Sequence, residues 1–163
     1  MSVCVYIGLG SNLQEPVQQI TKALEDLNDI EGSRLIKDSG LFKSPPMGPQ
    51  DQPDYINAVA LLETELDAES LLDQLQLIEK QHGRIRTRHW GERTLDLDIL
   101  LYGDDVINTE RLTIPHNGLT DREFVLYPLQ RIDPDLFIPG KGKLKSLIEQ
   151  CPVSGIEFLG NDL

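Results

Sequence analysis

The sequence predicts an α+β domain in which helices cover a mainly antiparallel sheet. Segments with strand and helix patterns are interspersed, and the Gly-Asp-Asp turn at residues 103–105 predicts at least one hairpin. The 163 residues suit one domain, because a single hydrophobic core commonly organises about 100 to 200 residues. We therefore expect residues 1–163 to form one unit without internal repeats.

Hydrophobic spacing and capping residues place the individual elements. In chain order we expect a strand at 2–9, a helix from Pro16 to Asn28, strands at 35–42 and 55–66, a helix from Asp67 to Gly83, a strand at 94–102, and short helices at 121–126 and 144–148. The two long helices have apolar stripes at helical spacing. Gly8, Gly10, Ser11 and Asn12 are interpreted as a strand-to-helix turn, in which Ser11 and Asn12 satisfy backbone groups. Gly103 should begin a turn into an antiparallel strand near Ile107.

Composition and charge argue against several functional classes. No stretch approaches the roughly 18 apolar residues of a membrane helix, and the chain begins with a predicted strand, so we expect a cytoplasmic protein. Cys4 and Cys151 have neither metal-ligand nor disulfide-scaffold spacing and are predicted to be structural thiols. The net charge of −12 disfavours general nucleic-acid binding. Four arginines within residues 84–93 instead favour a small polyanion.

The most informative segment is Arg-Thr-Leu-Asp-Leu-Asp-Ile-Leu-Leu at residues 93–101. Side chains alternate between the faces of a strand, so Asp96 and Asp98 should project together from one face. Their Cα atoms would be about 6.5 to 7 Å apart, which lets the carboxylates share one or two hard cations. A solvated strand face is the alternative. The side chains expected in the core are Leu95, Leu97, Ile99 and Leu101.

Arginines next to this strand suggest phosphate chemistry. Arg84, Arg86 and Arg93 are the leading phosphate-binding candidates, because the guanidinium group is always charged and offers a planar fork of donors. Magnesium could bridge the same phosphate oxygens to the acid pair. Exposed ion pairs on an acidic protein are the alternative. Trp90, in the same segment, could cover a planar substrate or fill a surface groove.

A Pro-rich segment at residues 44–53, followed by Tyr55 and Asn57, suits a flat heterocycle. It offers a wall, an aromatic surface, and an amide that both donates and accepts hydrogen bonds. A rigid connector leading into a core strand is the alternative. His116 could donate to a phosphate or be an ordinary surface histidine.

These motifs, in this order, resemble the 6-hydroxymethyl-7,8-dihydropterin pyrophosphokinase family. The motifs are Gly8-Leu9-Gly10-Ser11-Asn12-Leu13, Ser44-Pro45-Pro46 through Asp54-Tyr55-Ile56-Asn57, Gly83-Arg84 through Trp90-Gly91, and Arg93-Thr94-Leu95-Asp96-Leu97-Asp98-Ile99. The resemblance implies a ferredoxin-like fold and magnesium-dependent transfer of pyrophosphate from ATP to the pterin's hydroxymethyl group, releasing AMP, in tetrahydrofolate biosynthesis. We expect a monomer that binds ATP and the pterin but neither nucleic acid nor membrane.

The resemblance also implies roles for individual residues. Asp96 and Asp98 would hold two magnesium ions. The implied catalytic residues are Arg84, Arg86, Arg93, Asp96 and Asp98. The implied ATP-binding residues are Gln76, Glu79, Arg84, Arg86, Trp90, Arg93, Ile99, His116 and Arg122. The implied pterin-binding residues are Ser44, Pro45, Pro46, Met47, Tyr55, Asn57, Trp90 and Phe124, with Tyr55 and Phe124 on the two faces of the ring. The arginine segment is one residue shorter than in familiar bacterial members, so the individual roles of Arg86, Arg88 and His89 stay open.

Two other functions use the same charges. A metal-dependent phosphatase or nucleotide hydrolase would replace the pterin with water as the nucleophile. A noncatalytic, cation-stabilised binding module would use the acids and arginines only for recognition. Pterin-dependent formation of AMP separates the three hypotheses.

Overall fold

The computed structural model describes residues 2–12, 15–45, 53–83, 95–119, 123–151 and 155–160, without the side chains of 123 and 124. The strands are β1 (Val3–Ser11), β2 (Ser33–Asp38), β3 (Leu41–Ser44), β4 (Tyr55–Thr64), β5 (Asp96–Tyr102), β6 (Ile107–Asn108), β7 (Thr113–Ile114), β8 (Phe137–Ile138), β9 (Gly142–Lys143) and β10 (Glu157–Gly160). The helices are α1 (Pro16–Asn28), α2 (Ala68–Gln81), α3 (Glu123–Ile132) and α4 (Leu144–Glu149).

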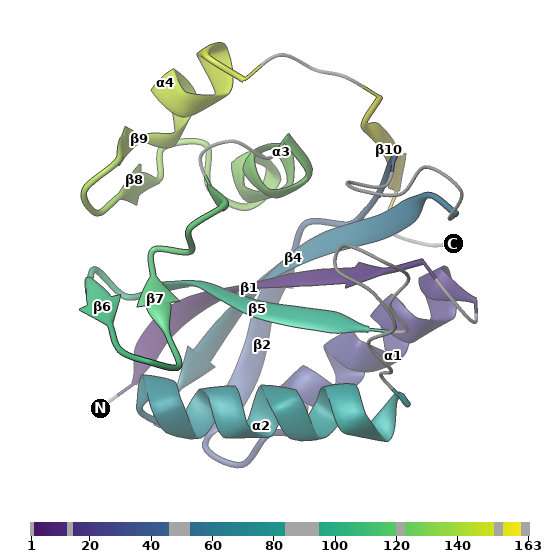
Figure 1. The fold of residues 1–163 in the computed structure, drawn as a ribbon, viewed down its shortest axis with the longest axis vertical. Helices are drawn as coiled ribbons and strands as arrows, with labels where there is room; N and C mark the ends of the chain where they lie inside the picture. The colour runs from purple at the N-terminus through teal and green to yellow at the C-terminus, as the bar shows by residue number, and fades with distance from the viewer. Residues whose placement is uncertain are drawn as a thin grey trace.

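A six-stranded antiparallel sheet forms the centre of the molecule (Figure 1). Its order is β10-β3-β4-β1-β5, and β2 pairs with β4 beside this path. Helices α1 and α2 lie on one side of the sheet, and α3 and α4 lie on the other. The predicted fold class, a ferredoxin-like α+β domain with a mainly antiparallel sheet covered by helices, is confirmed.

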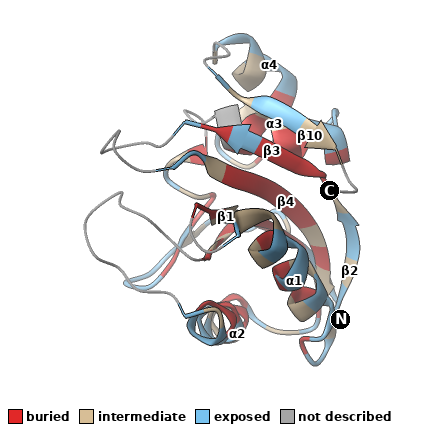
Figure 2. Ribbon diagram, turned by 90° about the vertical axis from the view of Figure 1, so that its right-hand side faces the viewer, coloured by how far each residue is buried: buried red, intermediate tan, exposed pale blue. Residues whose placement is uncertain are grey.

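Helices α1 and α2 close one face of the sheet with an apolar core. Helix α2 begins as predicted, because Asp67 Oδ1 accepts a hydrogen bond from the Ser70 backbone N–H at 2.7 Å. Its apolar stripe, Leu71, Leu75 and Ile78, is buried against the sheet. Buried residues line β4 and the inward sides of both helices (Figure 2). This core fixes the positions of β1, β4 and β5, the strands that also form the opposite face of the sheet.

The second face carries a separate core beneath α3 and α4. Leu126 and Leu129 of α3 pack with Val59 of β4 and with Leu100 and Leu101 of β5. Helix α4 agrees with the short helix predicted at 144–148. Helix α3 continues to Ile132, well beyond the predicted end at 126, and Asp121, its expected cap, lies outside the described residues. The part of this face that bears polar residues is the candidate site described below.

The predicted turn at Gly8, Gly10, Ser11 and Asn12 is wrong for the two glycines and for Ser11. Strand β1 continues to Ser11, and Gly8 and Gly10 pair with β4 on one side and β5 on the other. Neither glycine has a positive φ, so both adopt ordinary extended backbone. Only Asn12 lies beyond the strand, and its side-chain amide donates to the Pro53 carbonyl at 3.0 Å. Strand pairing on both sides overrides the local turn preference of glycine.

The predicted strand at 35–42 is divided into β2 and β3. Gly40 has a φ of 78°, which interrupts the extended backbone between them. The Ser39 hydroxyl oxygen accepts from the Val59 N–H at 2.9 Å, so this side chain replaces a ladder bond at the break. Strand β4 therefore pairs with two successive strands along one edge.

Two expectations for the segment around β5 also need correction. A bulge at Leu100 shifts the register, because Ile7 pairs with Ile99 while Tyr6 pairs with Leu101. Leu101 therefore joins the core under α3 instead of sharing the face of Ile99. The strand expected near residues 106 and 107 is β6, and it pairs with β7 instead of β5. The strands β7, β8, β9 and β10 were not predicted.

Neither Cys4 nor Cys151 forms a disulfide in the described structure, and Cys4 is exposed on β1. Within the described parts of the chain, no helix is long and apolar enough to span a membrane.

Candidate active site

Asp96 and Asp98 lie on one face of the edge strand β5. Both are partly exposed, whereas Leu95, Leu97 and Ile99 between and beside them are buried on the opposite face. The Asp98 side chain is 43% exposed. Carboxylate oxygens are the ligands that Mg²⁺ prefers, and two of them on adjacent outward positions fit a shared hard cation. The residues present therefore fit the magnesium that the sequence predicts.

A row of paired residues connects the acid pair to the amide of Asn57. Gly10 of β1 lies between Asn57 of β4 and Asp96 of β5, and Gly8 in the next row lies between Val59 and Asp98. Residues directly opposite each other in antiparallel strands point to the same face. Asn57 and Asp96 thus share one face, two strands apart, with no side chain between them.

The Asn57 amide is held in one orientation by Ser44. Its Nδ2 donates to Ser44 Oγ at 2.6 Å, and both residues are at most 5% exposed. With the nitrogen directed at Ser44, Oδ1 faces Gly10: it lies 3.4 Å from the position that a Cβ of Gly10 would occupy. Tyr55, two residues earlier on β4, has its ring 3.8 Å from the same position. The amide, the aromatic ring and the acid pair therefore border one area of the sheet.

His116 is the predicted ATP-binding residue that the structure brings to the acid pair. Its backbone N–H donates to the Leu100 carbonyl at 3.0 Å, which fixes the residue beside the bulge of β5. Its ring Nδ1 accepts from the Gly118 N–H at 3.1 Å. The ring proton is therefore on Nε2, which lies 4.0 Å from Asp98 Oδ1. His116 thus presents a donor to this side of the site.

Glu79 and Ile99, two further predicted ATP-binding residues, have buried side chains. Glu79 is 5% exposed, and its Oε2 accepts from the Leu97 N–H at 2.8 Å, which ties α2 to β5. The Ile99 side chain is 3% exposed in the core under α1 and α2. Gln76, on the same helix as Glu79, is exposed, and its Oε1 accepts from Arg111 at 3.3 Å.

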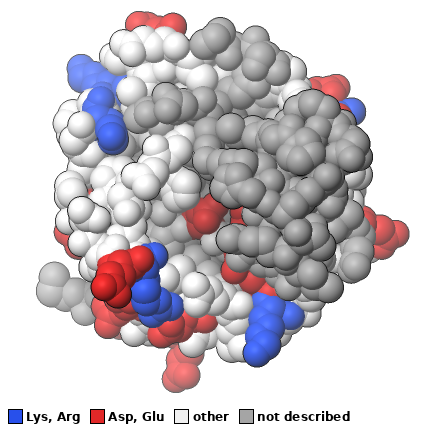
Figure 3. Space-filling view, viewed as in Figure 1, with Lys and Arg blue, Asp and Glu red and all other residues white. Residues whose placement is uncertain are grey.

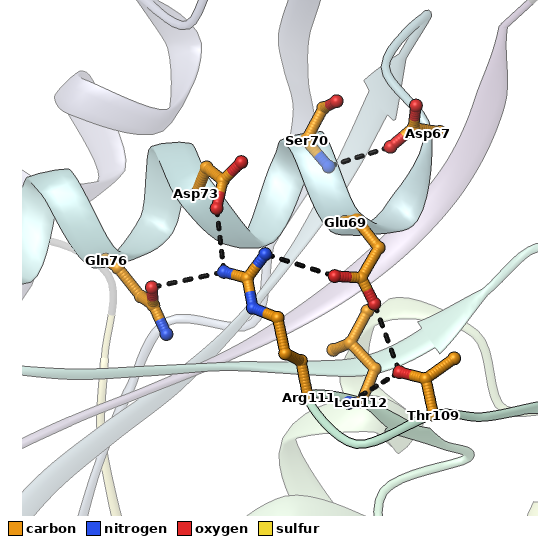
Figure 4. Close-up of polar contacts among 8 residues, drawn as sticks. All are labelled: Asp67, Glu69, Ser70, Asp73, Gln76, Thr109, Arg111 and Leu112. Atoms are coloured by element: carbon orange, nitrogen blue, oxygen red, sulfur yellow. Dashed lines mark hydrogen bonds and ion pairs between the residues drawn. The ribbon is translucent and has the colours of Figure 1, made fainter.

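Arg111 is a charged residue to which the sequence assigned no role (Figure 4). It reaches from the segment between β6 and β7 to α2, where it contacts Glu69 at 3.1 Å and Asp73 at 2.7 Å. The hydrogen bond to Asp73 is the largest cause that raises the pKa of Arg111. The spacing of Glu69, Asp73 and Gln76 at i, i+4 and i+7 is the signal that could have predicted one basic partner for this helix face.

Several predicted site residues fall outside the described part of the chain. They are Arg84, Arg86, Trp90 and Arg93 of the arginine segment, Pro46 and Met47 of the Pro-rich segment, and Arg122. Phe124 lies in α3, but its side chain is not described, and Pro45 is exposed directly after β3.

Acidic atoms are recessed near the centre of the face seen in Figure 3. Among the residues whose positions are given, no group of three or more His, Cys, Asp or Glu could hold a metal.

Comparison with known proteins identifies the family. The 7,8-dihydro-6-hydroxymethylpterin-pyrophosphokinase family matches residues 6–134. The 2-amino-4-hydroxy-6-hydroxymethyldihydropteridine pyrophosphokinase of Haemophilus influenzae is 53% identical over 91% of this chain and 92% of its own length. The protein of the same name from Pseudomonas aeruginosa is 48% identical over 95% of this chain and 96% of its own length.

The solved structures support the fold. A crystal structure of Plasmodium falciparum HPPK-DHPS with pteroate matches with a TM-score of 0.72 and 14% sequence identity. The match covers 92% of this chain and 42% of that one, so the chain spans less than half of that protein. From the sequence matches, the chain belongs to the 7,8-dihydro-6-hydroxymethylpterin-pyrophosphokinase family.

Proposed function

We propose that the chain transfers pyrophosphate from ATP to the hydroxymethyl oxygen of 6-hydroxymethyl-7,8-dihydropterin and releases AMP on the sheet face that bears Asp96 and Asp98. As a member of its family the chain is an enzyme, a diphosphokinase of folate biosynthesis. The observation that carries the placement is the row Asn57, Gly10 and Asp96. It brings an amide suited to a heterocycle and a carboxylate suited to a cation onto one face of the sheet, two strands apart.

The pterin would bind at the β4 end of this row. Asn57 has a buried carbonyl oxygen that can accept from the ring, and Ser44 prevents the amide from rotating. Tyr55 offers an aromatic surface beside it, and we propose that Phe124 covers the other face of the ring. Pro45, Pro46, Met47 and Trp90 complete the proposed pocket.

ATP would bind at the β5 end. We propose that Asp96 and Asp98 hold two magnesium ions, whose charge would stabilise phosphate oxygens at this end of the row. The His116 Nε2–H is directed toward Asp98 and can donate to an anion there. The remaining phosphate and nucleotide contacts that we propose are Arg84, Arg86, Arg93, Arg122 and Gln76.

Glu79 and Ile99, which the family resemblance assigns to ATP binding, would also support this end of the row. The Glu79 carboxylate accepts from the Leu97 N–H, and Ile99 packs in the core directly after Asp98. We propose that both residues fix the path of β5 and, through it, the spacing of the acid pair. We also propose that residues 1–163 act as a single monomeric domain in the cytoplasm, which sedimentation and cell fractionation would test.

The experiment is a product assay with four reaction mixtures: complete, without the pterin, without Mg²⁺, and without ATP. We expect AMP and the pterin diphosphate in equal amounts from the complete mixture only. Phosphate release without the pterin would instead identify a phosphatase or nucleotide hydrolase. Tight binding of ATP with no product from folded protein would identify a binding module and contradict the proposal.

A further inference from the structure

Two glycines of β1 occupy adjacent rows on the same face of the sheet, beside the proposed site. Gly10 pairs with Asn57 and Asp96, and Gly8 pairs with Val59 and Asp98. Glycine inside a strand weakens it and marks either a tight packing contact or a place where a ligand approaches the backbone. The two glycines can therefore be compared directly, position by position.

Gly8 is explained by the packing of the protein itself. A Cβ at this position would lie 3.3 Å from Leu100 Cδ2 and 3.5 Å from Leu100 Cγ. Leu100 is the extra residue at the bulge of β5, and its side chain covers Gly8 within the core under α3. A side chain at position 8 would therefore require Leu100 to shift by a few tenths of an ångström.

Gly10 has no such explanation within the described structure. Its φ is not positive, so its backbone would accept an L-residue. Among the residues whose positions are given, only Asn57 at 3.4 Å and Tyr55 at 3.8 Å come within 4 Å of its would-be Cβ, and both distances are ordinary contacts. Alanine would fit here and would restore the strand stability that glycine sacrifices.

The Asn57 carbonyl oxygen gives a second, independent indication of a ligand at Gly10. Asn57 is 5% exposed, and its hydrogen bond to Ser44 uses the nitrogen only. Within the described residues no donor binds Oδ1, which faces the position above Gly10. A buried acceptor without a donor is costly, so this oxygen is expected to accept from a group that enters over Gly10.

From these observations we infer that Gly10 is a specificity-determining residue. Its missing side chain lets the edge of the pterin approach the β1 backbone between Asn57 and Asp96 and donate to Asn57 Oδ1. A methyl group here would raise the floor of the site by about 1.5 Å, the length of a carbon–carbon bond, and would displace a ring held at van der Waals contact. The inference rests on the proposed function. It adds a reason why no side chain covers the sheet between Asn57 and Asp96.

The test compares Gly10→Ala with Gly8→Ala, two identical changes on one strand and one face. Binding of 6-hydroxymethylpterin is measured by calorimetry in the presence of a nonhydrolysable ATP analogue and Mg²⁺, and thermal unfolding is measured for each protein. For Gly10→Ala we expect Kd for the pterin to rise by about tenfold or more, since a displaced hydrogen bond and ring contact exceed 1.4 kcal/mol. Its Tm should equal or exceed that of the wild type, and Kd for the nucleotide alone should stay unchanged. Gly8→Ala should leave Kd for the pterin unchanged.

Each other outcome overturns the inference. If Gly10→Ala binds the pterin as the wild type does, pterin binding does not require position 10 to lack a side chain. If Gly10→Ala lowers the Tm by several degrees, glycine is required by the fold. An equal loss of pterin affinity in Gly8→Ala would show that any methyl on this face disturbs the site. If the wild type itself binds no pterin, the proposed function fails and the inference fails with it.

Discussion

The two faces of the central sheet are built from the same strands but differ in how they are filled. On the face under α1 and α2, apolar side chains such as Leu75 and Leu97 are buried in one continuous core. The face under α3 begins in the same way, but in the rows of Gly8 and Gly10 it carries glycines, an amide and two carboxylates. The closed face gives the strands fixed positions, and the other face uses those positions to arrange polar groups.

This difference separates stability from activity. Changes on the closed face should reduce the free energy of unfolding and leave the chemistry of the folded molecules intact. Changes in the polar rows should have the opposite effect. Substitutions on the two faces test this separation.

Asp98→Ala should abolish turnover while the protein stays folded. We expect the rate of AMP formation to fall by about 1000-fold or more, equivalent to about 4 kcal/mol of transition-state stabilisation, because one of the two proposed cation ligands is lost. The control is Asp105→Ala, which removes an exposed carboxylate just after the same strand. Wild-type turnover in Asp98→Ala, or an equal loss in the control, would contradict the role of the acid pair.

Leu75→Ala should destabilise the closed face. Leu75 is 0% exposed in the core, so its truncation is expected to cost about 2 to 5 kcal/mol of unfolding free energy in urea titrations. Turnover per folded molecule should not change. Leu77→Ala on the same helix, where the side chain is 48% exposed, should cost less than about 0.5 kcal/mol. A loss of turnover in folded Leu75→Ala would break the separation of the two faces.

Glu79→Ala should cost about 1 to 3 kcal/mol of unfolding free energy, because it leaves the buried Leu97 N–H without its acceptor. Glu79→Gln keeps an acceptor oxygen and should cost less. Urea titration measures both effects, and calorimetry measures ATP affinity. If Glu79→Gln is as stable as the wild type but loses ATP affinity, the carboxylate contacts the nucleotide, and the proposed supporting role is wrong.

Ser44→Ala should weaken pterin binding without affecting ATP binding. The change removes the acceptor that orients the Asn57 amide, so we expect a loss of about 0.5 to 1.5 kcal/mol in pterin affinity. Ser44→Thr retains the hydroxyl and should bind nearly as the wild type does. Equal pterin Kd values for the alanine and threonine variants would show that the hydroxyl does not orient Asn57.

The smallest expected effect is a change in thermal stability at acid pH. It involves Asp26, which lies away from the proposed active site. Burial would raise the pKa of Asp26, but the hydrogen bonds from Lys22 at 2.6 Å and His82 at 2.8 Å outweigh it and lower the pKa below the usual 3.8. This stabilisation is present above the unfolded pKa and is lost as the pH falls through the lower folded value. The Tm difference between wild type and Asp26→Asn should therefore be full near pH 7 and shrink toward pH 3. A constant difference would contradict the ionic contribution.

Local patterns were sufficient for the long elements. The apolar stripes of α1 and α2 and the cap at Asp67 predicted both helices, because a helix is stabilised by residues close in sequence. The alternation around Asp96 and Asp98 predicted their common face for the same reason. The resemblance to the family then supplied roles that no periodicity could give, and several of these residues fall in segments that the structure does not describe.

The errors arose where strand pairing joins distant residues. Gly8 and Gly10 resemble a turn in isolation, and only β4 and β5 on either side make them part of a strand. The short strand β10 pairs with β3 across more than a hundred residues, which no local signal predicts. The orientation of the Asn57 amide likewise depends on Ser44, a neighbour on another strand.

The extra residue at Leu100 puts the two halves of β5 out of phase. Before Leu100, the even-numbered residues Asp96 and Asp98 lie on the face under α3. After Leu100, the even-numbered Tyr102 points to the α2 face, where its hydroxyl donates to the Leu66 carbonyl at 2.6 Å. Loss of that one residue would make the ladder continuous and would leave the pairs on both sides of it unchanged. It would instead remove the side chain that covers Gly8 and the carbonyl that accepts from the His116 N–H. A single-codon deletion here should therefore disturb the anchoring of His116 and the packing under α3, while Asp96, Asp98 and Tyr102 keep their faces.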